Sequence, residues 1–287
     1  LGVVLRKRGD LAGARSRHEE SLRIRREIGQ KIGEVASLNN LGTVLLEQGE
    51  LTAAGRHFQE SLTLSSQTGS RSASAYALFG LAEVHARGGV TEEARKRHAA
   101  ALALREELGE KGTAAESRLA LASLLLDAGQ AERAEHLARA AADELARQGT
   151  GDARALALST AALAAAAGGD AATARSAMDQ AVTLLGPTQD LRTRLLVEIR
   201  AARLRRGPAP EATLGRVIER AGRAGMLEPQ LEARLALGDL EIETGRAAQG
   251  RERLAALQQE AQALGYGLIA RKAASRGSAA SELQVRR

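Results

Sequence analysis

The sequence has no cysteine and no tryptophan, and it contains only two phenylalanines, two tyrosines and four prolines. The absence of cysteine excludes disulfide bonds, thiol catalysis and thiolate metal sites. Because aromatic residues are so scarce, alanine, leucine, valine and isoleucine must fill the core, and alanine and leucine are strong helix formers. Four prolines in 287 residues leave long stretches free to be helical. The composition therefore predicts an all-α protein.

Long apolar segments are also lacking. No run approaches the roughly 20 residues that are needed to span a bilayer, and no signal peptide is visible. The chain begins at Leu1, in the middle of a repeat, and we interpret it as a fragment from which a targeting segment could have been lost. We expect a cytoplasmic protein without a membrane partner.

The positive charge does not gather in one part of the chain. The net charge is +6, but arginine is interspersed with glutamate and aspartate throughout, as in residues 23–27. This pattern is typical of solvated helix faces with i,i+4 ion pairs. No nucleic-acid-binding motif occurs. We therefore expect no nucleic-acid partner, and an anionic partner is the less favoured alternative.

Glycine recurs with a fixed period of 40 residues. A first ladder consists of Gly9, Gly49, Gly89, Gly129 and Gly169, and an alanine follows each of these glycines after five residues. A second ladder consists of Gly29, Gly69, Gly109 and Gly149. A period of this length is the sequence signature of stacked structural repeats.

The period divides the chain into seven units. We assign them to residues 1–40, 41–80, 81–120, 121–160, 161–200, 201–236 and 237–276, and the sixth is shorter than the others. The chain loses its regular pattern at Gly186-Pro187 and at residues 205–210. Residues 277–287 are small and polar, and we expect them to form a disordered tail.

Each unit is predicted to contain two helices. In the second unit a helical spacing places Leu38, Leu41 and Leu45 on one apolar stripe. Gly49 is expected to end this helix in a left-handed conformation. A second helix is expected from Glu50 to about Thr68. One such pair cannot bury its stripe alone, so the pairs must stack into a continuous core.

The repeated residues resemble the tetratricopeptide repeat family. In the second unit they are Leu41-Gly42, Leu45, Gly49, Ala54, Phe58 and Ser61-Leu62, and the same frame recurs from Leu1-Gly2. The period is longer than the common one of about 34 residues. It resembles the long-repeat subgroup of kinesin light chains and of bacterial signalling proteins. The resemblance implies a right-handed α-solenoid of about seven helix-turn-helix repeats.

In the proteins that this chain resembles, the first helix of each pair lines a concave groove in which partners bind. The resemblance and the i, i+3, i+7 spacing place seven residues on that groove and two on its flank: Asn40, Thr43, Glu47, Glu83, Arg87, Ser123 and Asp127 on the groove, and Asn39 and Tyr76 on the flank. Asparagine amides offer a donor and an acceptor to the backbone of an extended peptide, and an arginine can pair with a carboxylate. The alternative is that these residues are merely solvated.

No catalytic or metal site is predicted. The five histidines include no HExxH pair. His18 and His98 take the place of Phe58 in their units, so we expect them to be packing residues. The glycines are explained by turns and not by a phosphate-binding loop. We therefore expect no enzyme activity, no cofactor and no metal.

These patterns favour a scaffold that binds a protein or an extended peptide. The alanine- and arginine-rich composition resembles that of a high-GC bacterial genome, and we expect the sensor or docking region of a larger bacterial signalling protein. The alternative is a structural module that self-associates through end-to-end stacking of repeats, because the edge at Leu1 lacks a capping helix.

Overall fold

The computed structural model describes residues 1–186, 188–205, 207 and 209–285, with side chains up to residue 278. Over these residues the chain forms fifteen α-helices and no strand. The helices are α1 (Gly2–Lys7), α2 (Leu11–Glu27), α3 (Lys31–Gln48), α4 (Leu51–Gln67), α5 (Arg71–Gly88), α6 (Thr91–Glu107), α7 (Lys111–Asp127), α8 (Ala131–Arg147), α9 (Gly151–Ala167), α10 (Ala171–Thr183), α11 (Leu191–Arg203), α12 (Pro210–Arg223), α13 (Leu227–Glu243), α14 (Ala247–Ala263) and α15 (Gly267–Val285).

Most helices end at a left-handed glycine, as the sequence predicts, whereas α10 and α11 do not. Gly49 has a φ of 88° and follows α3 directly. Its N–H donates to the Leu46 carbonyl, and the N–H of Glu50 donates to the Leu45 carbonyl at 2.9 Å. These two bonds satisfy carbonyls that the end of an α-helix would otherwise leave free. The chain then turns back at once, so consecutive helices are antiparallel.

The predicted apolar stripe forms the contact within a pair. Leu38, Leu41 and Leu45 of α3 are buried in one cluster with Ala54 and Phe58 of α4. The glycine at position 42 matters here, because a Cβ atom on it would lie 2.9 Å from the Phe58 ring. Pairs of helices thus pack closely because small residues stand opposite large ones.

Alanine fills the middle of the chain. The core of α7–α11 is built mainly from fully buried alanines with a few larger side chains such as Leu145 and Met178. His18 and His98 are buried, as the sequence predicts for packing residues.

The stacking is interrupted between α10 and α11. Helix α11 packs on α9 and α13, whereas it contacts α10 far less than each other first helix contacts the helix before it. Arg200 fastens α11 to α9 by donating to the Ser159 hydroxyl at 2.8 Å and to the Leu156 carbonyl at 3.1 Å. Burial lowers the pKa of Arg200 to about 10, so the guanidinium is still charged at neutral pH.

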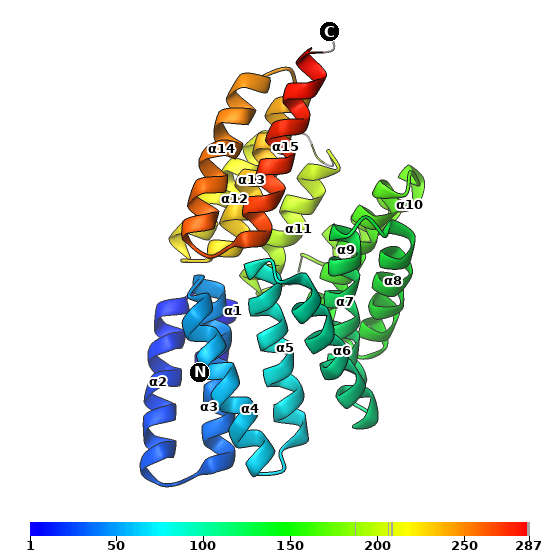
Figure 1. The fold of residues 1–287 in the computed structure, drawn as a ribbon. Coiled ribbons are helices and arrows are strands. Elements are labelled where there is room, and N and C mark those ends of the chain that lie inside the picture. Colours follow the sequence, from blue (N-terminus) through cyan, green and yellow to red (C-terminus); the bar gives the residue numbers. More distant parts are fainter. Residues whose placement is uncertain (187, 206, 208, 286–287) are drawn as a thin grey trace.

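The superhelix completes one turn and begins a second on top of the first. Figure 1 shows α11–α15 above α1–α5, with α6–α10 at the side. Helix α13 contacts α3, and α15 contacts α5. A Cβ atom on Gly267, the first residue of α15, would clash with the Gly88 carbonyl oxygen at the end of α5. We call this contact between the first and second turns the seam.

Two details differ from the expectations. Each sequence unit was framed on the Leu-Gly pair, but the helix pairs begin about ten residues earlier, at residues 31, 71, 111 and 151. Helix α15 continues to Val285, whereas a disordered tail was expected from residue 277. Residues 286–287 of that expected tail lie outside the described residues.

Candidate binding surface on the inner face of the superhelix

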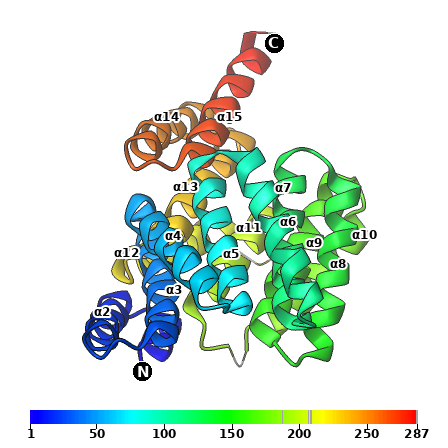
Figure 2. The same ribbon diagram turned by 60° about the horizontal axis from the view of Figure 1, so that its bottom comes forward.

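The first helices of the pairs line the inside of the turn. In Figure 2, α2 and α10 lie at the two outer sides, and α11 lies between α5 and α9. Lys7 of α1 and Asp152 of α9 face each other across the inside, with Nζ 3.9 Å from Oδ2. Residues from helices far apart in the sequence therefore share one inner face.

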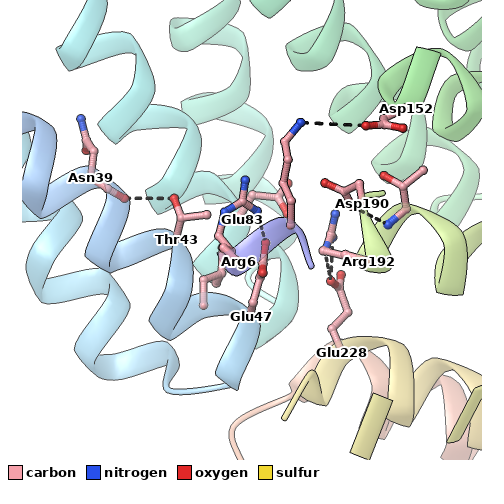
Figure 3. Close-up of polar contacts among 12 residues, drawn as sticks. Arg6, Asn39, Thr43, Glu47, Glu83, Asp152, Asp190, Arg192 and Glu228 are labelled. Atoms are coloured by element: carbon pink, nitrogen blue, oxygen red, sulfur yellow. Dashed lines mark hydrogen bonds and ion pairs between the residues drawn. The ribbon is translucent and has the colours of Figure 1, made fainter. Parts of the chain in front are cut away.

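Five of the nine predicted groove residues are engaged in contacts with other helices. Asn39 is buried, and its side-chain amide donates to the Ala73 carbonyl of α5 at 3.3 Å. Glu47 is buried and accepts a hydrogen bond from Arg6 of α1 (Figure 3). The buried roles of Asn39 and Glu47 differ from the partner-facing roles that were expected.

The other three engaged residues contact the second turn or stand beside that contact. Arg87 is buried, donates to the Leu46 carbonyl at 2.7 Å and pairs with Glu228 of α13 at 2.8 Å. Glu83 lies 3.6 Å from Arg87 and 3.4 Å from the His98 ring. Asp127 pairs with Lys272 of α15 at 2.7 Å. The chain itself therefore covers the part of the predicted groove that lies at the helix C-termini.

The remaining four residues are less enclosed. The hydroxyls of Thr43 and Ser123 donate to carbonyls of their own helices, at 3.0 Å and 3.2 Å. Asn40 is half-buried. Tyr76 is 38% exposed, which makes it the most accessible large side chain among the predicted residues. The accessible part of the inner face therefore lies nearer the N-termini of the first helices.

A charged network fills the inside at the seam. Glu228 accepts from Arg192 at 2.7 Å, as Figure 3 shows, and from Arg87 at 2.8 Å. Arg6 and Glu47 stand next to this group, and Glu83 completes it. Three arginines thus face three glutamates. Each of these charged side chains can be buried because an opposite charge compensates for the hydration that it loses.

Burial and charge shift the pKa values of these groups in opposite directions. Burial raises the pKa of Glu83, but the hydrogen bond with His98 and the charges of Arg87 and Arg192 outweigh it and lower that pKa to about 2. Burial raises the pKa of Glu47 more than Arg6 lowers it. Burial lowers the pKa of Arg192, and Glu228 and Glu47 more than reverse that effect. Glu83 therefore stays ionised in the folded protein.

Sequence reasoning missed Arg6, Arg192 and Glu228. A signal was present, since Arg192 and Glu228 are 36 residues apart, which is the length of the shortened sixth unit. Two residues at the same position of consecutive first helices face each other, and opposite charges there predict an ion pair. The contact with Arg87 carries no such local signal, because 141 residues separate Arg87 from Glu228.

Other features lie away from the inner face. A cavity of about 670 Å³ lies beside α9 and α10 and is lined by residues that include Arg154, Arg175 and Leu184. Within the described part of the chain, no group of three or more His, Asp or Glu side chains is placed to hold a metal ion. The described helices include none with the length and apolar character that crossing a membrane requires.

Known proteins share this architecture. Residues 1–67 match the family model described as tetratricopeptide repeat. No curated protein sequence matches the chain significantly. The solved structure of the apo form of RapI has a TM-score of 0.67 at 12% sequence identity and covers 96% of this chain and 95% of its own.

Two further solved structures agree. A Rap protein complexed with competence and sporulation factor has a TM-score of 0.58 at 14% identity, over 88% of this chain and 76% of its own. The apo form of the quorum sensor NprR from B. thuringiensis has a TM-score of 0.52 at 11% identity, over 95% of this chain and 83% of its own. At such identities the similarity concerns the fold alone. The repeated helix pairs are thus similar to those of tetratricopeptide repeats, and the family model itself matches residues 1–67.

Proposed function

We propose that this chain is a scaffold that binds a polypeptide on the accessible part of its inner face. The observation that carries the proposal is the exposure of Tyr76 on a face whose other end is covered by the chain's own second turn. An exposed tyrosine offers a large rigid contact area and a hydroxyl at a small loss of conformational entropy. Such side chains dominate the affinity of many protein interfaces.

The shape of the fold supports a polypeptide as the ligand. Curved solenoids present long concave surfaces, and tetratricopeptide repeat proteins are typically non-catalytic interaction scaffolds. The structurally similar Rap protein was solved in complex with competence and sporulation factor, and NprR is a quorum sensor. By analogy, this chain would be the sensor or docking region of a larger bacterial regulatory protein in the cytoplasm. Its ligand would be a signalling peptide or a partner protein.

Selection from a random peptide display library tests the proposal. We expect the chain to enrich a family of related peptides. The variants Tyr76→Ala and Asn40→Ala should each lose most of that enrichment, because each removes a side chain from the accessible region. Circular dichroism should show the same helix content in each variant as in the parent.

An arginine on the outer surface provides the control. Arg139→Ala lies on α8, where the side chain is half-exposed and pairs with Glu135, and it should leave the enrichment unchanged. If the chain selects peptides equally well with and without Tyr76, the inner face is not the binding surface. If no peptide is enriched by the parent chain, the proposed function is wrong.

Self-association is a second candidate, and exposed apolar side chains at one end favour it. Val4, Ile24 and Ile28 are 50%, 42% and 67% exposed on and after the first two helices. Exposed apolar groups of this kind often mark contact sites. Sedimentation at increasing protein concentration should then show a dimer that Ile28→Lys disrupts. A constant monomer mass contradicts this candidate.

A further inference from the structure

Lys7 stretches across the inner face to a carboxylate on a distant helix. Its Nζ lies 3.9 Å from Asp152 Oδ2, and the two side chains are 47% and 36% exposed. A contact this long between half-exposed groups contributes little to stability. Lys7 therefore occupies the inner face without being firmly held there.

Carboxylates outnumber the cations in this region. Glu116 of α7 and Asp152 of α9 both lie within electrostatic reach of Lys7, and Asp190 before α11 lies within reach of Asp152 and Arg6. Arg6 is engaged by Glu47 and Arg192 by Glu228, and Lys7 is the cation that offsets the charge of Asp152. Among the cations, Glu116 is influenced most by Arg105, whose guanidinium donates its hydrogen bonds to the Thr113 carbonyl and the Ser117 hydroxyl and not to the carboxylate.

Burial and neighbouring charges destabilise the ionised forms of two of these carboxylates. Burial raises the pKa of Asp152, Asp190 raises it further, and Lys7 only partly offsets the two effects. Burial also raises the pKa of Glu116. An additional positive charge at this place would stabilise the ionised forms.

Glu47 provides an independent indication of a missing cationic or donor group. Its side chain is only 6% exposed, and Arg6 binds one carboxylate oxygen. The other oxygen, Oε2, is buried and accepts no hydrogen bond from the described residues. Figure 3 shows Glu47, Asp152 and Asp190 directed into the same interior. An unpaired buried carboxylate oxygen is costly, and a donor from a ligand would satisfy it.

We infer that this face binds the cationic group of a polypeptide ligand, an ammonium or a guanidinium, and that Lys7 occupies its place in the ligand-free protein. The inference rests on the proposed function and specifies its ligand. Tyr76 and Asp190 both lie within electrostatic reach of Arg6, and an exposed aromatic ring attracts a cation. The protein would therefore prefer basic segments although its own net charge is +6. Lys7 acts as a tethered competitor that the ligand displaces from Asp152.

The two tyrosines of the chain make a direct test possible. Tyr76 is 38% exposed and Tyr266 is 1% exposed, so protein labelled with ¹³C-tyrosine gives one reporter signal and one internal control. The probe is N-acetyl-lysine methylamide, and the neutral comparison is N-acetyl-norleucine methylamide. We expect the lysine probe to shift the Tyr76 signal with saturation, the norleucine probe to leave it in place, and the Tyr266 signal to move with neither.

Variants separate the roles of the charged groups. Lys7→Ala should tighten binding of the lysine probe by roughly twofold to fivefold, because exposed ion pairs have energies of that order. Asp152→Asn and Asp190→Asn should weaken it, and asparagine at 190 can still accept the Thr193 N–H that begins α11. Lys96→Ala, which changes an exposed pair on α6, is the matched control and should have no effect.

The outcomes are distinguishable from those of the peptide selection. If the selected peptides bind but both probes shift Tyr76 alike, or if Lys7→Ala does not change affinity, the inference is overturned while the proposed function stands. If the selected peptides lack basic residues, the inference is also overturned. Failure of the selection itself would instead remove the proposed function.

Discussion

Arg87 of α5 donates a hydrogen bond of 2.8 Å to Glu228 of α13, although 141 residues separate them in the sequence. The contact joins the first turn of the superhelix to the second. Arg87 also donates to the Leu46 carbonyl near the end of α3, so one guanidinium holds three helices together. The seam is therefore a specific polar contact as well as a packing contact.

Loss of Arg87 should open the seam. The side chains of Arg87 and Glu228 are 7% and 19% exposed, and removing Arg87 leaves Glu228 with Arg192 alone and the Leu46 carbonyl without its donor. We expect Arg87→Met to destabilise the protein by about 2–4 kcal/mol in urea unfolding, with a smaller further loss when Glu228→Gln is added. Arg95→Met, which removes an exposed arginine that pairs with Glu92 on the same helix, should leave the midpoint unchanged. Equal midpoints for both arginine variants would contradict a structural role of the seam.

A pair of glycines at equivalent positions tests the close approach of the two turns. Gly267 and Gly151 are each the first residue of a first helix. A Cβ atom on Gly267 would clash with the Gly88 carbonyl oxygen, whereas one on Gly151 would meet nothing within 4 Å. We expect Gly267→Ala to destabilise the chain by roughly 1–3 kcal/mol, and Gly151→Ala to be neutral or slightly stabilising. If both substitutions have the same effect on the urea midpoint, the turns do not touch as described.

Phe58 sets a second steric requirement, between neighbouring pairs. A Cβ atom on Gly80 of α5 would overlap the Phe58 ring. Gly80→Ala should therefore destabilise the chain by roughly 1–3 kcal/mol, and Phe58→Leu should reduce that loss in the double variant because the two sites are coupled. Gly55→Ala is the control, since its nearest neighbour would be a Val84 methyl carbon at an ordinary 3.7 Å. Additive effects of Gly80→Ala and Phe58→Leu would exclude the contact.

The local part of the fold was predictable from the sequence. The helix expected from Glu50 to about Thr68 runs from Leu51 to Gln67, and Gly49 ends α3 in the left-handed conformation. Both results follow from helical spacing and from the conformational freedom of glycine, which are properties of neighbouring residues.

The seam was not predictable, because its position depends on how small rotations between pairs add up along the chain. As a result Arg87 and Asp127, which look like free groove residues in a single repeat, pair with Glu228 and Lys272 of the second turn. Helical spacing alone also did not determine which of two neighbouring residues faces the groove. Asn39, predicted only as a flanking residue, reaches the backbone of α5, whereas Asn40 is half-buried. The binding roles of the accessible residues stay predictions.

Glu83 and Glu47 should give the protein opposite responses to pH. The folded-state pKa of Glu83 is about 2, below its ordinary value of 4.5. Its ionised form therefore stabilises the fold above the unfolded pKa, and this contribution is lost as the pH falls from about 5 to about 2. The difference corresponds to at most roughly 3 kcal/mol. Glu83→Gln should be less stable than the parent at pH 6, and the two should converge in acid.

Glu47 has a raised folded-state pKa, because burial outweighs the charge of Arg6. The folded protein then binds more protons at this site than the unfolded chain, so the contribution of Glu47 to stability decreases as the pH rises above the unfolded pKa. The free energy of unfolding of Glu47→Gln, relative to that of the parent, should therefore be higher at pH 7 than at pH 4. This is the reverse of the trend for Glu83→Gln. Urea unfolding of the parent and both variants at pH 3, 4, 6 and 7 measures both trends. Parallel curves for the two variants would show that the network does not distinguish the two carboxylates as the structure requires.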